Sequence, residues 1–247
     1  MVKKKELKEL INLNFVDLTN NTYLVGKYDL PYVNCPNVLN PDYLALYSER
    51  CNYFKTENTW VCFYIFDRKF DTIDGIYNAI YYNNQRKLKK IKEKLLGVKY
   101  AIAPDYSQCG DIPRIENIYR LFKARIASLW MLFELDIIVI PNVTYANENY
   151  FDVMLDGLQN CEVVAFSVKG SVKETIEREL LLKAIEYTVD NLKMLKKIIV
   201  YSVLIDDERT KELFKYASNR GIEIVVPSNL LKERNKILSG VEPYGKD

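Results

Sequence analysis

The 247-residue sequence contains no histidine, so the commonest general base and the commonest transition-metal ligand are both absent. Ser-His-Asp and Cys-His catalysis are thereby excluded unless a partner supplies the histidine. Acid–base chemistry would fall to Asp, Glu, Lys or Tyr, and a metal ion would be held mainly by carboxylates. No cofactor is evident from the residues, and Mg²⁺ is the candidate metal.

Several other signals are missing from the sequence. It contains neither GxGxxG nor the GxxxxGK[ST] phosphate-binding loop, and its five cysteines form no CxxC pair. These absences argue against a Rossmann site, a P-loop, a zinc ribbon and a thioredoxin-like centre. No run reaches the roughly 18 apolar residues of a membrane span. Because unpaired cysteines are typical of a reducing compartment, we expect a cytoplasmic protein without a membrane partner.

The charge is nearly balanced, with 35 basic and 33 acidic residues, so net charge favours no class of partner. Positive charge is concentrated in one place, on the predicted amphipathic helix 85–96. Its basic residues are Arg86, Lys87, Lys89, Lys90, Lys92 and Lys94. Such a run either contacts phosphates or an acidic partner or forms the solvated face of a helix.

Short β-branched or aromatic runs alternate with longer helical stretches along most of the chain. The apolar runs are Trp60–Phe66, Val98–Ala103, Ile137–Ile140, Val163–Val168, Ile198–Val203 and Ile222–Val226. This alternation predicts an α/β fold with about six mainly parallel strands. The pattern leaves two arrangements open, a partial or distorted barrel and a doubly wound sheet.

The composition predicts three segments. Residues 1–58 are rich in Tyr, Asn and Pro and are expected to form an irregular N-terminal extension or cap. Residues 59–230 carry the α/β alternation and are predicted to form the main domain. Residues 231–247 are expected to be a basic C-terminal tail.

Polar residues follow several of the predicted strands, where the sites of α/β proteins collect. The clearest example is Pro104-Asp105-Tyr106-Ser107 with Asp111 a few residues later. Asp105 and Asp111 could act as catalytic bases or as ligands of Mg²⁺. The plainer alternative is that Asp111 caps the next helix and Asp105 caps the loop.

Two arginines on the helix after this loop could bind phosphate. Arg120 and Arg125 follow the acidic loop closely in the chain, and guanidinium groups match phosphate geometry. A buried or bridging Arg–Asp pair is the structural alternative.

Two later strand ends supply further candidates. Asn142 follows the strand 137–140 and could hydrogen-bond a base, a ribose or an amide, with Tyr145 stacking beside it. Lys169 lies in Ser167-Val168-Lys169-Gly170-Ser171, between a strand and a helix, where an anion could bind. Either segment could equally be an ordinary turn.

Residues 98–230 resemble domain of unknown function family 4417, which is found mostly in phages, prophages and other mobile elements. The positions that carry the resemblance are Pro104, Asp105, Tyr106, Ser107, Asp111, Pro113, Asn117, Tyr119, Arg120, Arg125, Pro141, Asn142, Tyr145 and Gly170. The sequence departs from the family pattern at Tyr145, where tryptophan is usual, and at Ala146, where glycine is expected. The resemblance implies a phage or mobile-element context, and it implies no reaction because the family has no established activity.

These observations lead to two hypotheses. In the first, the protein binds or acts on nucleic acid or a nucleotide at the carboxyl ends of its strands. In the second, it is a non-enzymatic interaction protein that inhibits or regulates a host defence or replication complex. The second would use the basic helix and the Tyr-rich N-terminal segment. The residues alone leave open whether the protein is an enzyme, which partner it binds and what its oligomeric state is.

Overall fold

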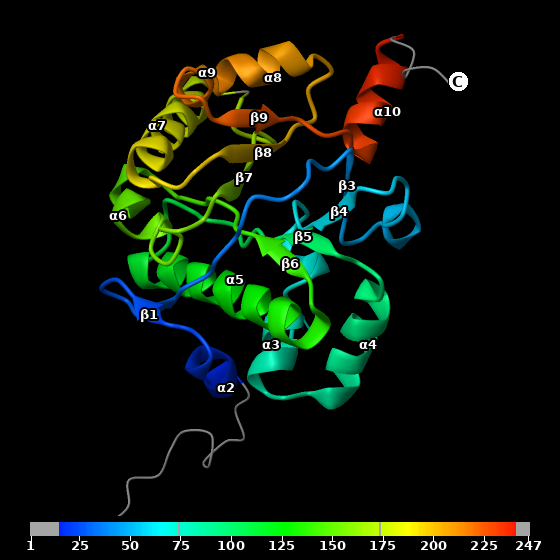
Figure 1. Cartoon of the computed structure of the whole chain (residues 1–247), viewed down its shortest axis with the longest axis vertical. Helices are drawn as coiled ribbons and strands as arrows, with labels where there is room; N and C mark the ends of the chain where they lie inside the picture. Colours follow the sequence, from blue (N-terminus) through cyan, green and yellow to red (C-terminus); the bar gives the residue numbers. More distant parts are fainter. Residues whose placement is uncertain (1–14, 74, 173, 241–247) are drawn as a thin grey trace, which may run out of the picture.

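The computed structural model describes residues 15–73, 75–172 and 174–240 and consists of parallel strands alternating with helices (Figure 1). One parallel sheet contains, in spatial order, β3 (Tyr43–Leu46), β4 (Thr59–Cys62), β5 (Tyr100–Ile102) and β6 (Ile138–Ile140). The other contains β7 (Val163–Ser167), β8 (Lys197–Tyr201) and β9 (Glu223–Val225). A small antiparallel pair joins β1 (Leu24–Val25) to β2 (Leu30–Pro31).

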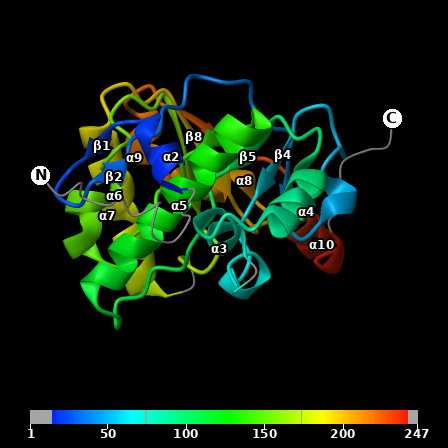
Figure 2. The ribbon, with the colours of Figure 1, turned by 90° about the horizontal axis from the view of Figure 1, so that it is seen from below.

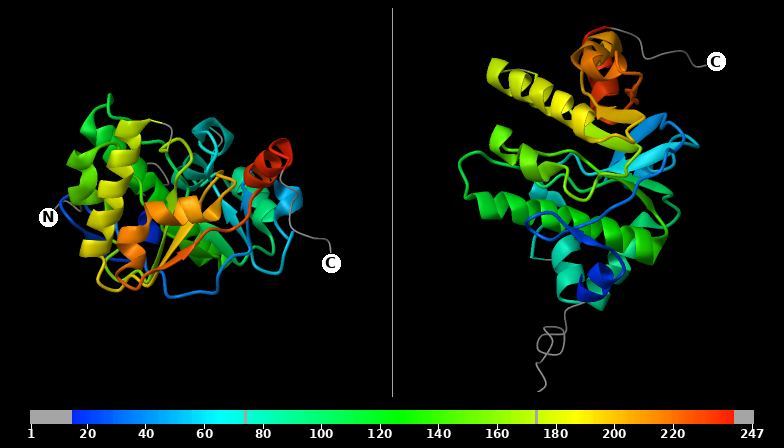
Figure 3. Two further views of the ribbon diagram at one scale, coloured as in Figure 1. Left: turned by 90° about the horizontal axis from the view of Figure 1, so that it is seen from above. Right: turned by 60° about the vertical axis from the view of Figure 1, so that its left-hand side comes forward.

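Helices cover the outer side of each parallel sheet. Those associated with the first sheet are α2 (Phe15–Asn20), α3 (Ile76–Tyr81), α4 (Gln85–Leu95) and α5 (Arg114–Leu135), shown in Figure 2. The helices later in the chain, after β6, are α6 (Phe151–Met154), α7 (Thr175–Asn191), α8 (Asp207–Leu213), α9 (Lys215–Ser218) and α10 (Leu230–Leu238), shown in Figure 3. Three short 3₁₀ turns, Arg50–Asn52, Asp67–Lys69 and Glu148–Tyr150, complete the described elements. Among the described helices, none combines the length and apolar character needed to cross a membrane.

The strand order distinguishes the two predicted arrangements. In both parallel sheets the strands follow one another in chain order, without the reversal that defines a doubly wound sheet. Single parallel bridges connect the sheets, one between Asn142 and Ala165 and one between Tyr43 and Ser228. The strands therefore form a distorted partial barrel that no continuous hydrogen-bond ladder closes.

The pleat of the strands divides the first sheet between two cores. Trp60 and Cys62 of β4 face inward, in a core shared with the second sheet and α7. The alternate residue Val61 packs outward against residues of α3, α4 and α5. Because successive side chains of a strand point to opposite faces, both faces are buried, as is usual for parallel sheets.

The predicted N-terminal extension, residues 1–58, contributes the strand β3 to the parallel sheet. All four residues of β3 are buried, and Leu44 pairs with Trp60 of β4. A strand buried on both faces shows no alternation of polar and apolar residues, so its pattern did not distinguish it from the irregular segment around it. Residues 1–14 lie outside the described part of the chain.

The predicted C-terminal tail begins as a helix. α10 starts after Asn229, whose side chain accepts a hydrogen bond from the backbone of Lys232 and donates one of 2.7 Å to the carbonyl of Ser202. Asn235 donates to the carbonyl of Val203 over 2.8 Å. Two side-chain amides therefore dock α10 onto the end of β8, while residues 241–247 lie outside the described part.

Two buried tyrosines test the cost of an unpaired hydroxyl. Tyr201 is fully buried and packs on Tyr64, and its hydroxyl has no hydrogen-bond partner among the described residues. The buried hydroxyl of Tyr53 donates to the carbonyl of Tyr47 over 2.8 Å. We expect Tyr201→Phe to leave the free energy of unfolding unchanged or raised, and Tyr53→Phe to lower it by about 1 kcal/mol. Equilibrium urea unfolding measures both, and equal losses in the two variants would contradict the assignment.

Candidate functional site

The carboxyl ends of four neighbouring strands bring polar side chains to one rim of the partial barrel. Tyr64 follows β4, Asp105 follows β5, Asn142 follows β6, and Lys169 follows β7. Because parallel strands all end on the same side, residues distant in the chain meet there. We call this cluster of four residues the rim site.

Asn142 is the centre of the rim site. Its side-chain oxygen accepts a hydrogen bond of 2.8 Å from the Tyr64 hydroxyl. Its side-chain nitrogen donates one of 2.8 Å to Oδ1 of Asp105. Lys169 joins the cluster by donating from Nζ to the backbone carbonyl of Tyr64 over 3.1 Å. The amide of Asn142 thus fixes the orientation of the Asp105 carboxyl group and leaves its second oxygen for a ligand.

The rim site opens into a cavity of about 250 Å³, which we call the rim pocket. Its walls are formed by Asp105, Ser107, Gln108, Asn142, Val143, Thr144, Tyr145, Phe166, Ser167, Lys169, Ser171 and Glu177. The wall therefore combines two carboxyl groups, two side-chain amides, several hydroxyl groups, one ammonium group and the aromatic ring of Tyr145. This combination can bind a ligand that is partly planar and partly charged.

The electrostatic surroundings of Asp105 raise the pKa of its carboxyl group to about 7. Burial is the largest cause, and the negative charge of Asp67 adds to it. The hydrogen bond from Asn142 and the positive charge of Lys169 oppose this rise in pKa. With a pKa near neutrality, Asp105 is present in both protonation states at pH 7 and can accept or donate a proton.

Asp67 is held in place by an ion pair behind the rim site. Arg120 donates from Nη1 to Asp67 over 2.9 Å and to the carbonyl of Ser107 over 3.2 Å. The hydroxyl of Ser107 donates to Asp67 over 2.8 Å, and Arg120 also pairs with Glu116 at 3.1 Å. The predicted phosphate clamp Arg120 is therefore engaged in fixing the β4 and β5 loops, as in the structural alternative of an Arg–Asp pair.

Two other predicted site residues lie away from the rim pocket. Arg125 is 3% exposed and points toward Asp156, whose carbonyl accepts a 3.4 Å hydrogen bond, and burial lowers the pKa of its guanidinium to about 10. Asp111 is exposed in the turn before α5. Pro113 is the N-cap of α5 and no side chain caps the helix, so Asp111 does not have the predicted capping role.

Tyr145 and Lys169 lie in the rim pocket, as their strand-end positions suggested. Tyr145 packs its ring edge-on against Phe151, with 5.8 Å between the ring centroids, and burial raises the pKa of its hydroxyl. Lys169 precedes Gly170, whose φ of 95° strains any residue with a side chain. Glycine at this position thus allows the turn that presents Lys169 to the pocket.

Of the two residues predicted to hold Mg²⁺, Asp105 lines the rim pocket and Asp111 does not. The carboxylate of Asp67, which was not among the predicted ligands, is engaged by Arg120 and Ser107. Across residues 15–73, 75–172 and 174–240, no three His, Cys, Asp or Glu side chains are grouped to bind a metal ion.

Tyr64 and Asp67 are the site residues that sequence reasoning did not select. Both follow β4, so the rule that picked Asp105 and Asn142 from the ends of later strands also applied to them. The Tyr64 hydroxyl gave no signal, since the apolar run Trp60–Phe66 indicated only a buried aromatic residue.

Comparisons with known proteins agree with the resemblance noted above. The sequence profile of a domain of unknown function, DUF4417, matches residues 23–217. The chain is 24% identical to the Gene 1 protein of Mycobacterium phage L5 over 165 residues, which cover 66% of each chain. It is 23% identical to the Gene 1 protein of Mycobacterium phage D29 over 157 residues, which cover 62% of this chain and 53% of that protein. No solved structure matches the chain.

The pKa of Asp105 should respond to its neighbours in opposite directions. Replacing Asp67 by Asn removes a negative charge, and we expect it to lower the pKa of Asp105 from about 7. Replacing Lys169 by Gln removes a positive charge, and we expect it to raise that pKa further. Carboxyl ¹³C NMR titration measures these shifts, with Asp105→Asn assigning the resonance. Shifts in the same direction would contradict the arrangement.

Proposed function

The chain belongs to the DUF4417 family of phage-associated domains of unknown function, and we propose that it binds a nucleotide in the rim pocket. The nucleotide is either free or one unit of a nucleic acid. The single observation that carries the proposal is the Asp105–Asn142 pair, with a carboxyl pKa of about 7, beside the cation Lys169. Asp105 is the group that exchanges a proton with the bound nucleotide.

The size and lining of the rim pocket suit one nucleotide unit. Its 250 Å³ is close to the lower end, about 300 Å³, of typical small-molecule sites. The half-buried ring of Tyr145 offers an aromatic surface on which a base can stack. The hydroxyl groups of Ser167 and Ser171 and the second oxygen of Asp105 can hydrogen-bond the edge of the base. Lys169 supplies the positive charge for its phosphate.

Asn142 has a different role from the base contact that its position suggested. Its oxygen already accepts a hydrogen bond from Tyr64, and its nitrogen already donates to Asp105. Because Asn142 is 7% exposed and these two hydrogen bonds align its amide with Asp105, we assign it the role of a positioning residue that acts through Asp105. Tyr64 in turn fixes the orientation of the amide, because only its oxygen can accept the tyrosine proton.

Binding of nucleoside 5′-monophosphates and of the matching nucleosides tests the proposal by isothermal titration calorimetry. At pH 6, where Asp105 is mostly protonated with or without Lys169, we expect Lys169→Gln to weaken monophosphate binding about tenfold, because a charge-assisted hydrogen bond is removed. We expect nucleoside binding at that pH to be unchanged. Asp105→Asn should remove the change in nucleoside affinity between pH 6 and pH 8, which is measured with nucleosides because the phosphate of a monophosphate itself titrates at about pH 6.

Lys193→Gln is the matched control, since Lys193 is exposed just after α7 and does not line the rim pocket. If neither nucleosides nor monophosphates bind the unsubstituted protein, the proposed function is wrong. An equal effect of Lys193→Gln would show that Lys169 acts only through the net charge.

A feature of α4 favours the second candidate function, that of an interaction protein. α4 buries Leu88, Ile91 and Leu95, whereas Arg86, Lys89 and Lys90 are exposed. The other cations are partly engaged, since Lys92 pairs with Glu134 at 2.8 Å and Lys94 lies over the ring of Tyr47. Three exposed cations on one rigid helix suit an acidic protein surface.

Charge reversal tests this second candidate. We expect Lys89→Glu with Lys90→Glu to abolish capture of a stoichiometric protein partner from nuclease-treated host extract, and to leave nucleotide binding at the rim pocket unchanged. The double reversal of Lys193 and Lys215 is the matched control, since both residues are exposed and lie outside α4. Unchanged capture of the partner by the Lys89/Lys90 variant would refute a contact through α4.

A further inference from the structure

A second cavity lies next to the rim pocket along the same rim. It measures about 360 Å³, and we call it the arginine pocket. It is lined by Val172, Arg178, Leu204, Arg209, Glu212 and Leu213. The two pockets meet along the chain, because Ser171 lines the first and Val172 the second, and Glu177 lines the first and Arg178 the second.

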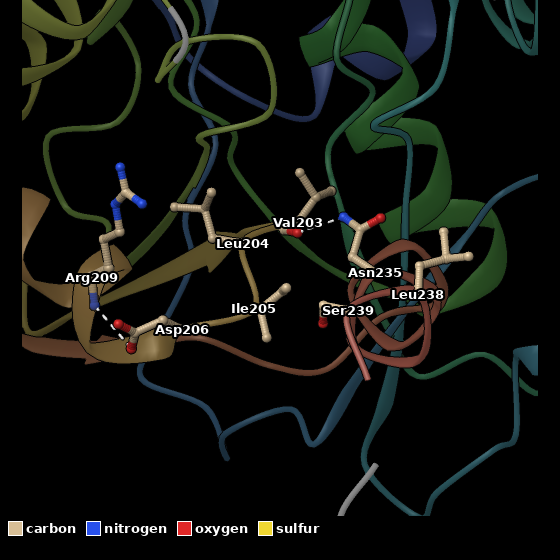
Figure 4. Close-up of a pocket in the computed structure, with 8 residues that line it drawn as sticks. All are labelled: Val203, Leu204, Ile205, Asp206, Arg209, Asn235, Leu238 and Ser239. Atoms are coloured by element: carbon tan, nitrogen blue, oxygen red, sulfur yellow. Dashed lines mark hydrogen bonds between the residues drawn. The ribbon is translucent and has the colours of Figure 1, made fainter. Parts of the chain in front are cut away.

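A third cavity of about 470 Å³ continues the row toward α10 (Figure 4). It shares Leu204 and Arg209 with the arginine pocket. Figure 4 shows that Leu204, Ile205 and Leu238 contribute apolar side chains to it. Beyond the carboxyl ends of β7 and β8, the second and third cavities are therefore continuous, and the rim pocket borders the second through neighbouring residues of the β7–α7 loop and of α7.

The positive charges of the arginine pocket are not neutralised within the described residues. The guanidinium groups of Arg178 and Arg209 are exposed, and no hydrogen bond or ion pair to another described residue engages either of them. Asp206 accepts the backbone N–H of Arg209 over 3.3 Å, and in Figure 4 the guanidinium points away from that carboxylate. Glu212 pairs with Lys215 at 2.9 Å.

Cations and apolar side chains recur along the row, beside the carboxyl groups of Glu177, Glu212 and Asp206. Lys169 borders the rim pocket, and two arginines with the apolar side chains of Val172, Leu204 and Leu213 follow in the next pocket. Proteins that hold single-stranded nucleic acid use this combination, with cations along the phosphates and apolar or aromatic surfaces against the bases. A duplex keeps its bases stacked inside the helix, where separate cavities cannot take them.

We propose that the ligand is a single-stranded nucleic acid with one nucleotide in the rim pocket and the adjoining phosphate and base in the arginine pocket. This inference rests on the proposed function of the rim pocket and extends it to a substrate class. Arg178 and Arg209 bind the phosphate, and neither touches the nucleotide in the rim pocket. A free mononucleotide therefore gains nothing from them, whereas an oligonucleotide does.

Fluorescence anisotropy with a labelled oligothymidylate of eight residues, beside calorimetry with thymidine monophosphate, tests the inference. We expect the oligomer to bind at least tenfold more tightly than the mononucleotide. The double variant Arg178→Gln with Arg209→Gln should weaken oligomer binding about tenfold and leave mononucleotide binding unchanged. It should also reduce the slope of log affinity against log salt concentration by about 0.7 for each phosphate that the variant no longer neutralises.

The double variant Arg86→Gln with Arg220→Gln is the matched control, since it removes two exposed arginines that lie outside all three cavities. An equal effect of this control would overturn the inference in favour of a general charge effect. If the mononucleotide binds and the oligomer binds no more tightly, the inference fails while the proposed function stands. If neither binds, the proposed function fails first. If polyglutamate displaced the labelled oligonucleotide as well as unlabelled oligothymidylate does, the ligand would be an acidic protein and the inference would be wrong.

Discussion

The geometry of the rim site depends on one residue, Asn142, because it joins the two sheets and also orients the carboxyl group of Asp105. Its backbone forms the bridge to Ala165, supported by hydrogen bonds of 2.8 and 2.9 Å on either side. Its side chain connects Tyr64 to Asp105. A shift between β6 and β7 would therefore move the amide and the carboxyl group together. The same residue thus connects the two sheets and sets the positions of the side chains in the rim site.

The surroundings of Asp105 both oppose and support its ionisation. Burial and the charge of Asp67 disfavour its ionised form, whereas Asn142 and Lys169 favour it. Arg120 lies behind this arrangement and pairs with Asp67 at 2.9 Å, which partly neutralises the charge that Asp105 experiences. Structural ion pairs also perturb pKa values, so the shift alone does not identify a site. At Asp105 it coincides with a cavity and with a second carboxyl oxygen that accepts no hydrogen bond from the residues the structure describes.

The fold could be predicted from the sequence to the extent that hydrophobic periodicity controls it. The alternation of apolar runs and helices predicted a mainly parallel α/β fold, and the structure confirms it. The strand β3 was not predicted, because a four-residue strand buried on both faces carries no periodic signal. The four residues that were chosen because they follow strands all line the rim pocket: Asp105, Asn142, Tyr145 and Lys169. Parallel strands end at the same edge of a sheet, so this part of the site could be selected from the sequence.

The helix residues were harder to place than the strand-end residues. Arg120 and Arg125 are five positions apart, which at about 100° per residue turns their side chains about 140° away from each other. One therefore faces Asp67 beside the rim, whereas the other faces Asp156 in the interior. Sequence proximity to Asp105 suggested both, but a helix that spans the sheet can present only part of its surface to one end. Assigning that part requires the packing angle, which the sequence pattern does not contain.

The carboxyl group of Asp105 would be expected to repel the phosphate of the proposed ligand, but its protonation removes this repulsion. Lys169 now lowers the pKa of Asp105, and a phosphate bound to Lys169 would offset that effect and add negative charge. Both changes favour the protonated, uncharged form of Asp105. Ligand binding and proton uptake therefore favour each other, as linkage requires. A carboxyl group with a pKa near 7 gives up its charge at little cost, so the same shift that enables proton exchange also allows the rim pocket to hold an anion.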